Sequence, residues 1–193
     1  MSNSKTVLDE TPFQTAGPFL HIGCLPNAIN IEGIFDTDLG VKPFANKDYD
    51  KFITITGSVF DGDGKALDDI MLESWQSDEN GVYSPECGFA RFVPDSLTKK
   101  FNLYTLKPGF MNNIDGKAQS PHILLSISSR GLNMTLNTRI YFEGDDLTSD
   151  PLLSTVRNSR NDVSSLVAKK IDEDIFLFDI FLQGDRETIF LDI

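Results

Sequence analysis

Histidine, cysteine and long apolar segments are scarce in this chain of 193 residues. The two cysteines, Cys24 and Cys87, stand far apart and no histidines cluster around them, so neither a zinc site nor a redox motif is indicated. A reducing compartment fits this usage best. The N-terminus has no apolar core of secretory length, and no later run approaches the roughly 20 apolar residues of a membrane-spanning helix. We therefore expect a cytoplasmic protein.

Positive charge is also in short supply. Lysine and arginine total 17 against 29 aspartates and glutamates, which gives a formal net charge of −12. This surplus argues against nucleic acid or an anionic membrane as a partner, because both would be repelled at long range. It still allows a small anionic ligand, which needs only a local cluster of positive charge.

The length and a hydrophobic content of 40% are typical of a globular protein with one sizeable core. We expect a single domain over residues 1–193, with residues 1–50 as an N-terminal arm and irregular segment and residues 51–193 as the core. The arm contains Gly17 and Pro18, which exclude regular helix and allow close approach to a ligand or another chain. A plain surface connection is the open alternative for this arm.

Alternating apolar and polar residues predict short β-strands along the core segment. The clearest run includes Ile53, Ile55 and Val59 and ends in a hairpin-turn signal at residues 61–64. Further predicted strands cover residues 69–75, 101–106, 122–128 and 134–142, followed by a C-terminal hairpin of residues 175–182 and 187–193. Short strands divided by Gly, Asp and Asn turns predict a mainly β fold, a β-sandwich of mixed topology.

One helix is predicted near residue 150. Ser149 and Asp150 are N-cap candidates before Pro151 at the first helical position, and apolar residues follow at helical spacing. We expect this helix to break within residues 158–162 and to be followed by a second short helical piece up to Leu166. The fold would therefore contain one or two short helices.

The predicted strand at residues 122–128 nearly carries a metal-binding pattern. Two histidines at positions i and i+2 of a strand project side by side and can share one ion. Here His122 has the first position and Leu124 the second. A lone histidine is more often hydrogen-bonded within the structure than a ligand, and His21, which has no companion, is also interpreted as structural.

With these elements in this order, the sequence resembles the intradiol ring-cleaving dioxygenases. The matching segments are spread from residue 11 to the C-terminus, so the resemblance does not depend on any single motif. They comprise residues 11–12, 14–18, 21–23, 57–64, 73–83, 106–109, 121–123, 130–131, 138–142, 166–169, 178–180 and 183–184.

The resemblance implies which positions would hold a metal. Iron-binding chains of this family bind ferric ion with two tyrosines and two histidines, one tyrosine shortly after a Lys-Pro-Gly turn and the histidines as H-x-H. By resemblance, Met111 occupies that tyrosine position, His122 and Leu124 occupy the histidine positions, and the shortened segment 84–88 offers no equivalent of the other tyrosine. Methionine and leucine cannot replace phenolate and imidazole on ferric ion. We expect no iron to be bound by this chain alone.

The resemblance further implies an α chain paired with a β chain that binds Fe(3+), in an (αβ)n assembly. Such an assembly cleaves protocatechuate (3,4-dihydroxybenzoate) with O2 between the two hydroxyl-bearing carbons, a step of aromatic catabolism. The α chain supplies no catalytic residue alone but lines the partner's pocket, and the implied substrate-binding residues are Thr15, Gly17, Pro18 and Arg130. By itself Arg130 would be an ordinary turn arginine; in a pocket its guanidinium offsets the charge of an anionic substrate.

Two alternatives remain open. One is a self-sufficient intradiol catechol dioxygenase with an unusual ligand set, against which Met111 and Leu124 count. The other is a noncatalytic β-sandwich module for binding or scaffolding. Elsewhere we expect Trp75 and Tyr83 to be core or interface residues, and Glu73 to pair with Arg139 on a neighbouring strand.

Overall fold

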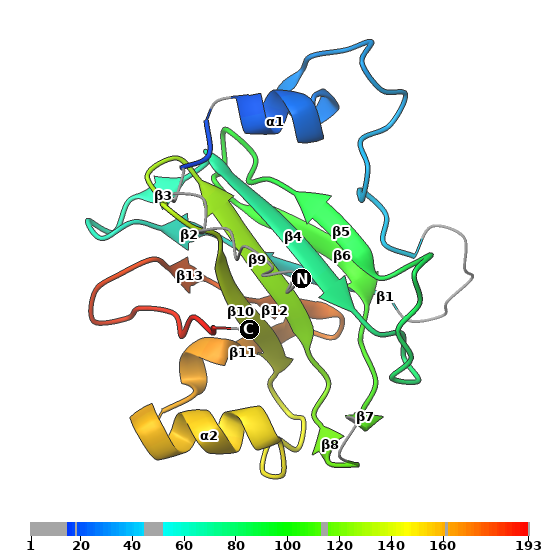
Figure 1. The fold of residues 1–193 in the computed structure, drawn as a ribbon, viewed down its shortest axis with the longest axis vertical. Helices are drawn as coiled ribbons and strands as arrows, with labels where there is room; N and C mark the ends of the chain where they lie inside the picture. Colours follow the sequence, from blue (N-terminus) through cyan, green and yellow to red (C-terminus); the bar gives the residue numbers. More distant parts are fainter. Residues whose placement is uncertain (1–14, 18, 45–51, 113–115, 161, 193) are drawn as a thin grey trace, which may run out of the picture.

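Eight β-strands form one strongly curved sheet that makes up most of the protein (Figure 1). The computed structural model describes residues 15–17, 19–44, 52–112, 116–160 and 162–192. In sheet order the strands are β5 (Phe89–Phe92), β4 (Ile70–Gln76), β9 (Ile123–Ser129), β10 (Leu136–Phe142), β11 (Val167–Asp172), β12 (Ile175–Leu177), β1 (Phe52–Gly57) and β6 (Phe101–Leu106). Neighbouring strands are antiparallel except for β10 with β11 and β1 with β12. The expected mixed topology is confirmed.

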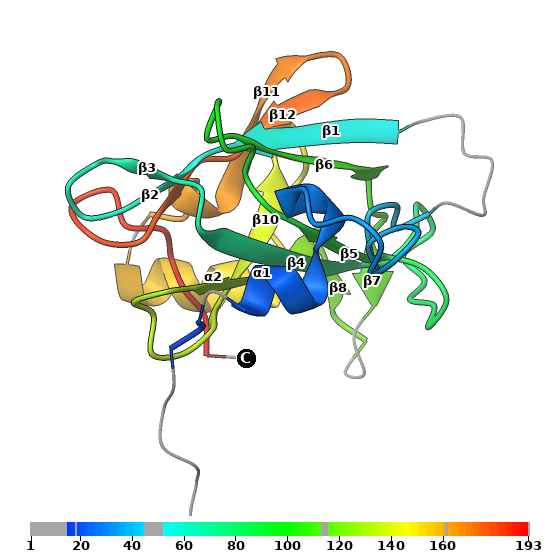
Figure 2. The same cartoon turned by 90° about the horizontal axis from the view of Figure 1, so that it is seen from above.

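The sheet bends so that its two halves face each other across the core. In Figure 2, β1, β11 and β12 lie in one layer and β4, β5 and β10 in the other. The halves meet through aromatic pairs, with Phe142 edge-on to Phe176 at 5.1 Å and Phe92 against Phe101 at 5.7 Å between ring centroids. Full burial of a side chain such as Phe101 or Phe142 stabilises the fold by about 1.5–3 kcal/mol. The predicted sandwich is thus built from a single bent sheet.

The hairpin predicted at residues 61–64 is present in a small second sheet. Its strands are β13 (Ile180–Phe181), β2 (Val59–Phe60) and β3 (Ala66–Leu67), and β2 pairs antiparallel with β3. Gly64 closes the turn with a φ of 77°, in the left-handed region that glycine adopts without a steric penalty. A third sheet contains only β7 (Met111–Asn112) and β8 (Ala118–Gln119).

Helix α2 (Pro151–Arg160) begins where the sequence predicts. The Asp150 carboxylate caps it, because one of its oxygens accepts hydrogen bonds from the backbone N–H groups of Leu152 and Leu153, each at 3.0 Å. The helix ends within the predicted break, and the short 3₁₀ helix η2 (Ser164–Leu166) follows it. The face of α2 that carries Leu153 packs on Tyr141 of β10.

Several parts of the fold differ from the prediction. Residues 20–50 were expected to be irregular, but they include most of helix α1 (Phe19–Cys24) and the 3₁₀ helix η1 (Asn27–Ile29). The second strand of the predicted C-terminal hairpin does not form. The segment instead crosses the end of the sheet, where Leu191 donates its N–H to the carbonyl of Asn137 at 2.8 Å. Strands β5 and β11 have no counterpart in the prediction.

A charged side chain explains why the predicted strand of residues 175–182 is divided into β12 and β13. Asp179 lies between them, and its carboxylate accepts a hydrogen bond from the backbone N–H of Ser58 at 3.0 Å. The Asp179 side chain is partly exposed, and it takes the Ser58 N–H at the point where the neighbouring segment passes from β1 to β2. Within the described residues, no helix is long and apolar enough to cross a membrane.

Candidate functional site

The N-terminal arm is tied to the turn that follows β9. The Thr15 hydroxyl accepts a hydrogen bond from the backbone N–H of Gly131 at 2.8 Å and donates to the carbonyl of Ser129 at 3.4 Å. Gly131 has a φ of 86°, which suits this tight turn. Two residues expected to act together, Thr15 and Arg130, are therefore brought to one place. We call Thr15, Gly17, Asp69 and Arg130 the arm site; Pro18 lies outside the described residues.

Arg130 is held by an acidic residue that the sequence reasoning missed. Its guanidinium Nε donates to the carboxylate of Asp69, and 64% of the arginine side chain stays exposed. Asp69 directly precedes β4, and the Ser129 hydroxyl donates to its backbone carbonyl at 2.6 Å. The signal that could have revealed this partner is the register of β4 on β9, which places Ile70 opposite Ser129 and hence Asp69 beside Arg130.

Helix α1 adds a histidine behind this ion pair. His21 is buried, and its Nδ1 lies 3.7 Å from the Asp69 carboxylate. Its Nε2 is buried without a hydrogen-bond partner in the described part of the chain. The interpretation of His21 as structural fits this position, since the ring supports Asp69 and leaves the exposed face to Arg130. Phe19, also on α1, is 77% exposed.

Gly17 has open space around it. A side chain at this position would meet no atom of the described residues within 4 Å. The close approach expected of the Gly17–Pro18 pair therefore has no counterpart in the part of the chain that the structure describes.

The three positions that correspond to metal ligands do not offer a ligand set. His122 is only 2% exposed, and its Nδ1 lies 2.8 Å from the carbonyl oxygen of Ser120. Burial and the nearby charge of Arg139 lower the pKa of His122 to about 4, against the weaker opposing effects of Ser120 and Asp150. Leu124 lies two residues further on the same face, partly exposed.

An arginine occupies the place where these positions converge. Leu124 lies directly opposite Arg139 on β10, and Met111 lies opposite Gln119 on β8. Arg139 in turn donates from Nη1 to the Gln119 side-chain oxygen at 3.1 Å and to the Tyr141 hydroxyl at 3.3 Å. A fixed guanidinium repels a ferric ion, and no group of three or more His, Cys, Asp or Glu could hold a metal among the described residues. These residues do not fit a resident iron.

Arg139 also affects the pKa values of two tyrosines. Burial raises the pKa of Tyr141 far above its usual range and raises that of Tyr83 as well, and in both cases Arg139 opposes the shift. Both phenols stay protonated at neutral pH in the chain without metal.

The expected pair of Glu73 and Arg139 is wrong. Glu73 instead accepts two hydrogen bonds from Arg91, at 2.8 Å from Nε and 2.6 Å from Nη2. The register explains this choice, because Arg91 on β5 lies directly opposite Glu73, whereas β9 separates Glu73 from β10.

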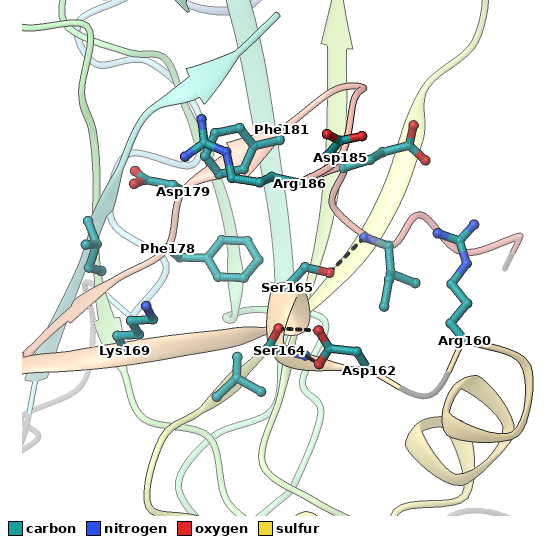
Figure 3. A pocket seen from close by; sticks show the side chains of 14 residues that line it. Arg160, Asp162, Ser164, Ser165, Lys169, Phe178, Asp179, Phe181, Asp185 and Arg186 are labelled. Atoms are coloured by element: carbon teal, nitrogen blue, oxygen red, sulfur yellow. Dashed lines mark hydrogen bonds between the residues drawn. The ribbon is translucent and has the colours of Figure 1, made fainter. Parts of the chain in front are cut away.

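A cavity of about 550 Å³ lies beside the C-terminal segment, away from the predicted site residues (Figure 3). Its lining combines three basic and four acidic side chains, namely Arg160, Lys169, Arg186, Asp162, Asp179, Asp185 and Glu187. Arg186 stacks on Phe181 at 4.2 Å from the ring centroid, and Asp162 is bonded to Ser164. This balance of charge selects no particular ligand.

Comparisons with known proteins agree on one family. A family model described as Dioxygenase matches residues 30–184. The protocatechuate 3,4-dioxygenase alpha chain of Pseudomonas putida is 36% identical over 96% of this chain and 98% of its own length. The protein of the same name from Burkholderia cepacia is 31% identical over 97% of this chain and 100% of its own length.

Solved structures show the same fold at low identity. Hydroxyquinol 1,2-dioxygenase from Pseudomonas putida DLL-E4 matches with a TM-score of 0.58 and 19% identity, over 84% of this chain and 72% of that chain. Catechol 1,2-dioxygenase from Acinetobacter sp. ADP1 matches with a TM-score of 0.57 and 18% identity, over 77% of this chain and 58% of that chain. The bent sheet is thus a dioxygenase fold.

Proposed function

Because the chain belongs to the dioxygenase family, we propose that it is the non-iron-binding alpha subunit of a heteromeric protocatechuate 3,4-dioxygenase. The assembly would insert both atoms of O2 into 3,4-dihydroxybenzoate, between the two hydroxyl-bearing carbons, and release 3-carboxy-cis,cis-muconate. Similarity to two alpha chains over nearly the full length of each supports this assignment. A cytoplasmic location fits the two free cysteines, Cys24 and Cys87.

One contrast within the molecule carries the proposal. The arm site is assembled, since Thr15 bonds the turn after β9 and Asp69 holds Arg130 beside it. The positions that correspond to metal ligands are not, since Met111 and Leu124 offer no hard donor and Arg139 takes the central place. A subunit that shapes a partner's pocket without binding metal would have both properties.

The chemistry of the metal therefore belongs to the partner in this proposal. A beta subunit would hold Fe(3+) and activate the catechol, in an (αβ)n assembly. The residues of this chain would bind and orient the substrate next to that metal. We place Thr15, Gly17, Pro18 and Arg130 in this role.

Arg130 is suited to the substrate carboxylate by its geometry. Asp69 binds the guanidinium through Nε, which leaves the edge formed by the two Nη groups as the one that can bind a carboxylate with two parallel hydrogen bonds. The ion pair also restricts the rotamers of a long, exposed side chain before substrate arrives. Less conformational entropy is then lost on binding.

The experiment that tests the proposal compares the chain alone with the chain co-expressed with its beta partner. Iron content and protocatechuate-dependent O2 uptake are measured on both preparations. We expect the chain alone to contain no stoichiometric iron and to take up no O2, and the complex to have both. Stoichiometric iron and turnover in the chain alone would instead favour a self-sufficient dioxygenase. A complex without turnover would favour a scaffold.

A further inference from the structure

The carboxylate of Asp69 lies between two side chains that can carry a positive charge. Its Oδ2 accepts the hydrogen bond from Nε of Arg130, and its Oδ1 lies 3.7 Å from Nδ1 of His21. The two neighbours come from different elements, because Arg130 follows β9 and His21 belongs to α1, which lies above this end of the sheet in Figure 1. Asp69 therefore connects α1 to the arginine that we place in the substrate pocket.

The contact of His21 with Asp69 is too long for a hydrogen bond and indicates which ring nitrogen carries the hydrogen. A charge-assisted N–H···O bond spans about 2.7–2.9 Å, so a ring with its hydrogen on Nδ1 would lie closer to the carboxylate. The 3.7 Å distance fits a neutral ring with the hydrogen on Nε2 and the lone pair of Nδ1 towards Asp69. Nδ1 is then the position that can accept a second proton. Nε2, which is buried without a hydrogen-bond partner in the described part of the chain, carries its hydrogen in both forms.

Few other described residues can influence the charge of this ring. Asp69 is the one acidic side chain within ion-pair distance of His21 among the residues that the structure describes. The preceding Asp68 is paired with Lys99, and the only other titratable side chain of α1 is Cys24. The charge state of His21 therefore depends mainly on Asp69 and on the group that compensates its negative charge.

Arg130 supplies this compensation in the absence of a ligand. Its guanidinium neutralises Asp69, so the carboxylate has little excess charge that could hold a proton on Nδ1 of His21. A second carboxylate that binds the Nη edge of Arg130 shares its positive charge, and the negative charge of Asp69 is then less compensated. Histidine side chains change charge in the range of pH 5 to 8. Binding of a carboxylate therefore favours the protonated ring.

We propose that His21 takes up one proton from the solvent at Nδ1 when a substrate carboxylate binds Arg130, so that the arm site binds carboxylates more tightly as the pH falls. The inference rests on the proposed function, which places Arg130 against the substrate. The sign follows from linkage, because the bound state holds one more proton than the free state and a lower pH favours it. His21 acts through Asp69 and does not touch the substrate, so it is a positioning residue and not a catalytic one.

The test compares a substrate that has the carboxylate with a ligand that lacks it. In the complex with the beta subunit, O2 uptake gives KM for protocatechuate and the inhibition constant of catechol at three pH values between roughly 8 and 6, an interval in which histidine titrates. The ratio of the first constant to the second should fall at least about fivefold over this interval, since a coupling between two binding events is typically of this size or larger. The substrate carboxylate stays ionised throughout, so its own titration does not contribute.

His21→Gln replaces the ring by an uncharged amide and should leave the ratio independent of pH. His122→Gln is the matched control, because it removes the only other histidine of the chain, whose pKa of about 4 lies below the tested interval. This control should retain the pH dependence of the unmodified complex. Asp69→Asn, which removes the charge that attracts the proton, should abolish the pH dependence and takes the place of His21→Gln if that variant does not fold.

A ratio that does not change with pH in the unmodified complex overturns the inference. An equal change in the His21→Gln complex, or in the Asp69→Asn complex that takes its place, overturns it as well. Both results leave the proposed function intact, because protocatechuate is still turned over. An unmodified complex without turnover of protocatechuate contradicts the proposed function itself, and the inference with it, so the same measurement distinguishes the two failures.

Discussion

Arg139 on β10 lies directly opposite Leu124 on β9, the residue that the family resemblance assigns to one of two metal-binding histidine positions. A positive charge therefore lies directly beside this position. Together with burial, which is the larger cause, the charge of Arg139 also lowers the pKa of His122.

Restoring the histidine alone should therefore not restore iron. We expect Leu124→His to purify with no more iron than the unmodified chain, since Arg139 still repels a ferric ion and Met111 still offers no hard donor. Metal analysis of both proteins after growth in iron-rich medium checks this. An iron content near one per chain in the variant would show that the guanidinium is no obstacle.

Removal of the Arg130 guanidinium should mainly affect substrate binding. In the complex with the beta subunit, Arg130→Ala should raise KM for protocatechuate by roughly tenfold and change kcat less, because a ground-state contact to a carboxylate is lost. Steady-state O2 uptake at low salt measures both constants. Arg157→Ala on α2, which removes a distant guanidinium, is the control. An unchanged KM in Arg130→Ala would remove this residue from the pocket.

A bulky residue at position 17 should lower the activity of the complex and leave the stability of the chain nearly unchanged. Because a side chain there meets none of the described residues within 4 Å, Gly17→Val should change the free energy of unfolding by less than about 0.5 kcal/mol. Turnover of the complex should nevertheless fall, since the proposal places Gly17 against the partner's pocket. Urea unfolding of the chain and O2 uptake by the complex are compared. Full activity with a normal fold would contradict the role of the arm.

The buried His122 should make stability depend on pH. Its pKa is about 4 in the folded protein and about 6.5 when unfolded, so the unfolded state binds the proton first as the pH falls. The free energy of unfolding therefore has its full value above pH 6.5. It falls progressively between pH 6.5 and 4, by up to about 3 kcal/mol in total.

Urea unfolding at pH 7, 6 and 5 measures this effect before most carboxylates titrate. His122→Gln should lose less stability over that interval than the unmodified chain. The pKa of His122 is set by burial and by Arg139, Ser120 and Asp150, and the variant leaves these three residues in place. Equal losses in the two proteins would mean that His122 is accessible to protons in the folded state.

Much of the fold follows from local rules that the sequence displays. Ile53 and Ile55 alternate with polar residues and are buried in β1, and Asp150 before Pro151 caps α2 as such a pair predicts. Local rules did not predict contacts between residues that lie far apart in the sequence. Asp69 is recognisable as the partner of Arg130 only once β4 is in register with β9.

The wrong partner for Glu73 has a similar origin. Strand β5 is only four residues long and follows a segment rich in Gly, Pro and Cys, so its alternation is too short to predict a strand. Without β5, no predicted strand placed Arg91 beside Glu73. The juxtaposition of Thr15 with Arg130 likewise came from family resemblance, because no local rule links residues more than 100 positions apart.

The contact of Ser58 with Asp179 joins residues 121 positions apart, and the parallel pairing of β1 with β12 spans a similar distance. On a translating ribosome, β1 is therefore made long before the strand that completes one of its sides. That edge of β1 stays open until almost the entire chain has emerged, and contacts of this range slow folding. Nascent chains of this protein should thus need protection from premature strand pairing during most of their synthesis.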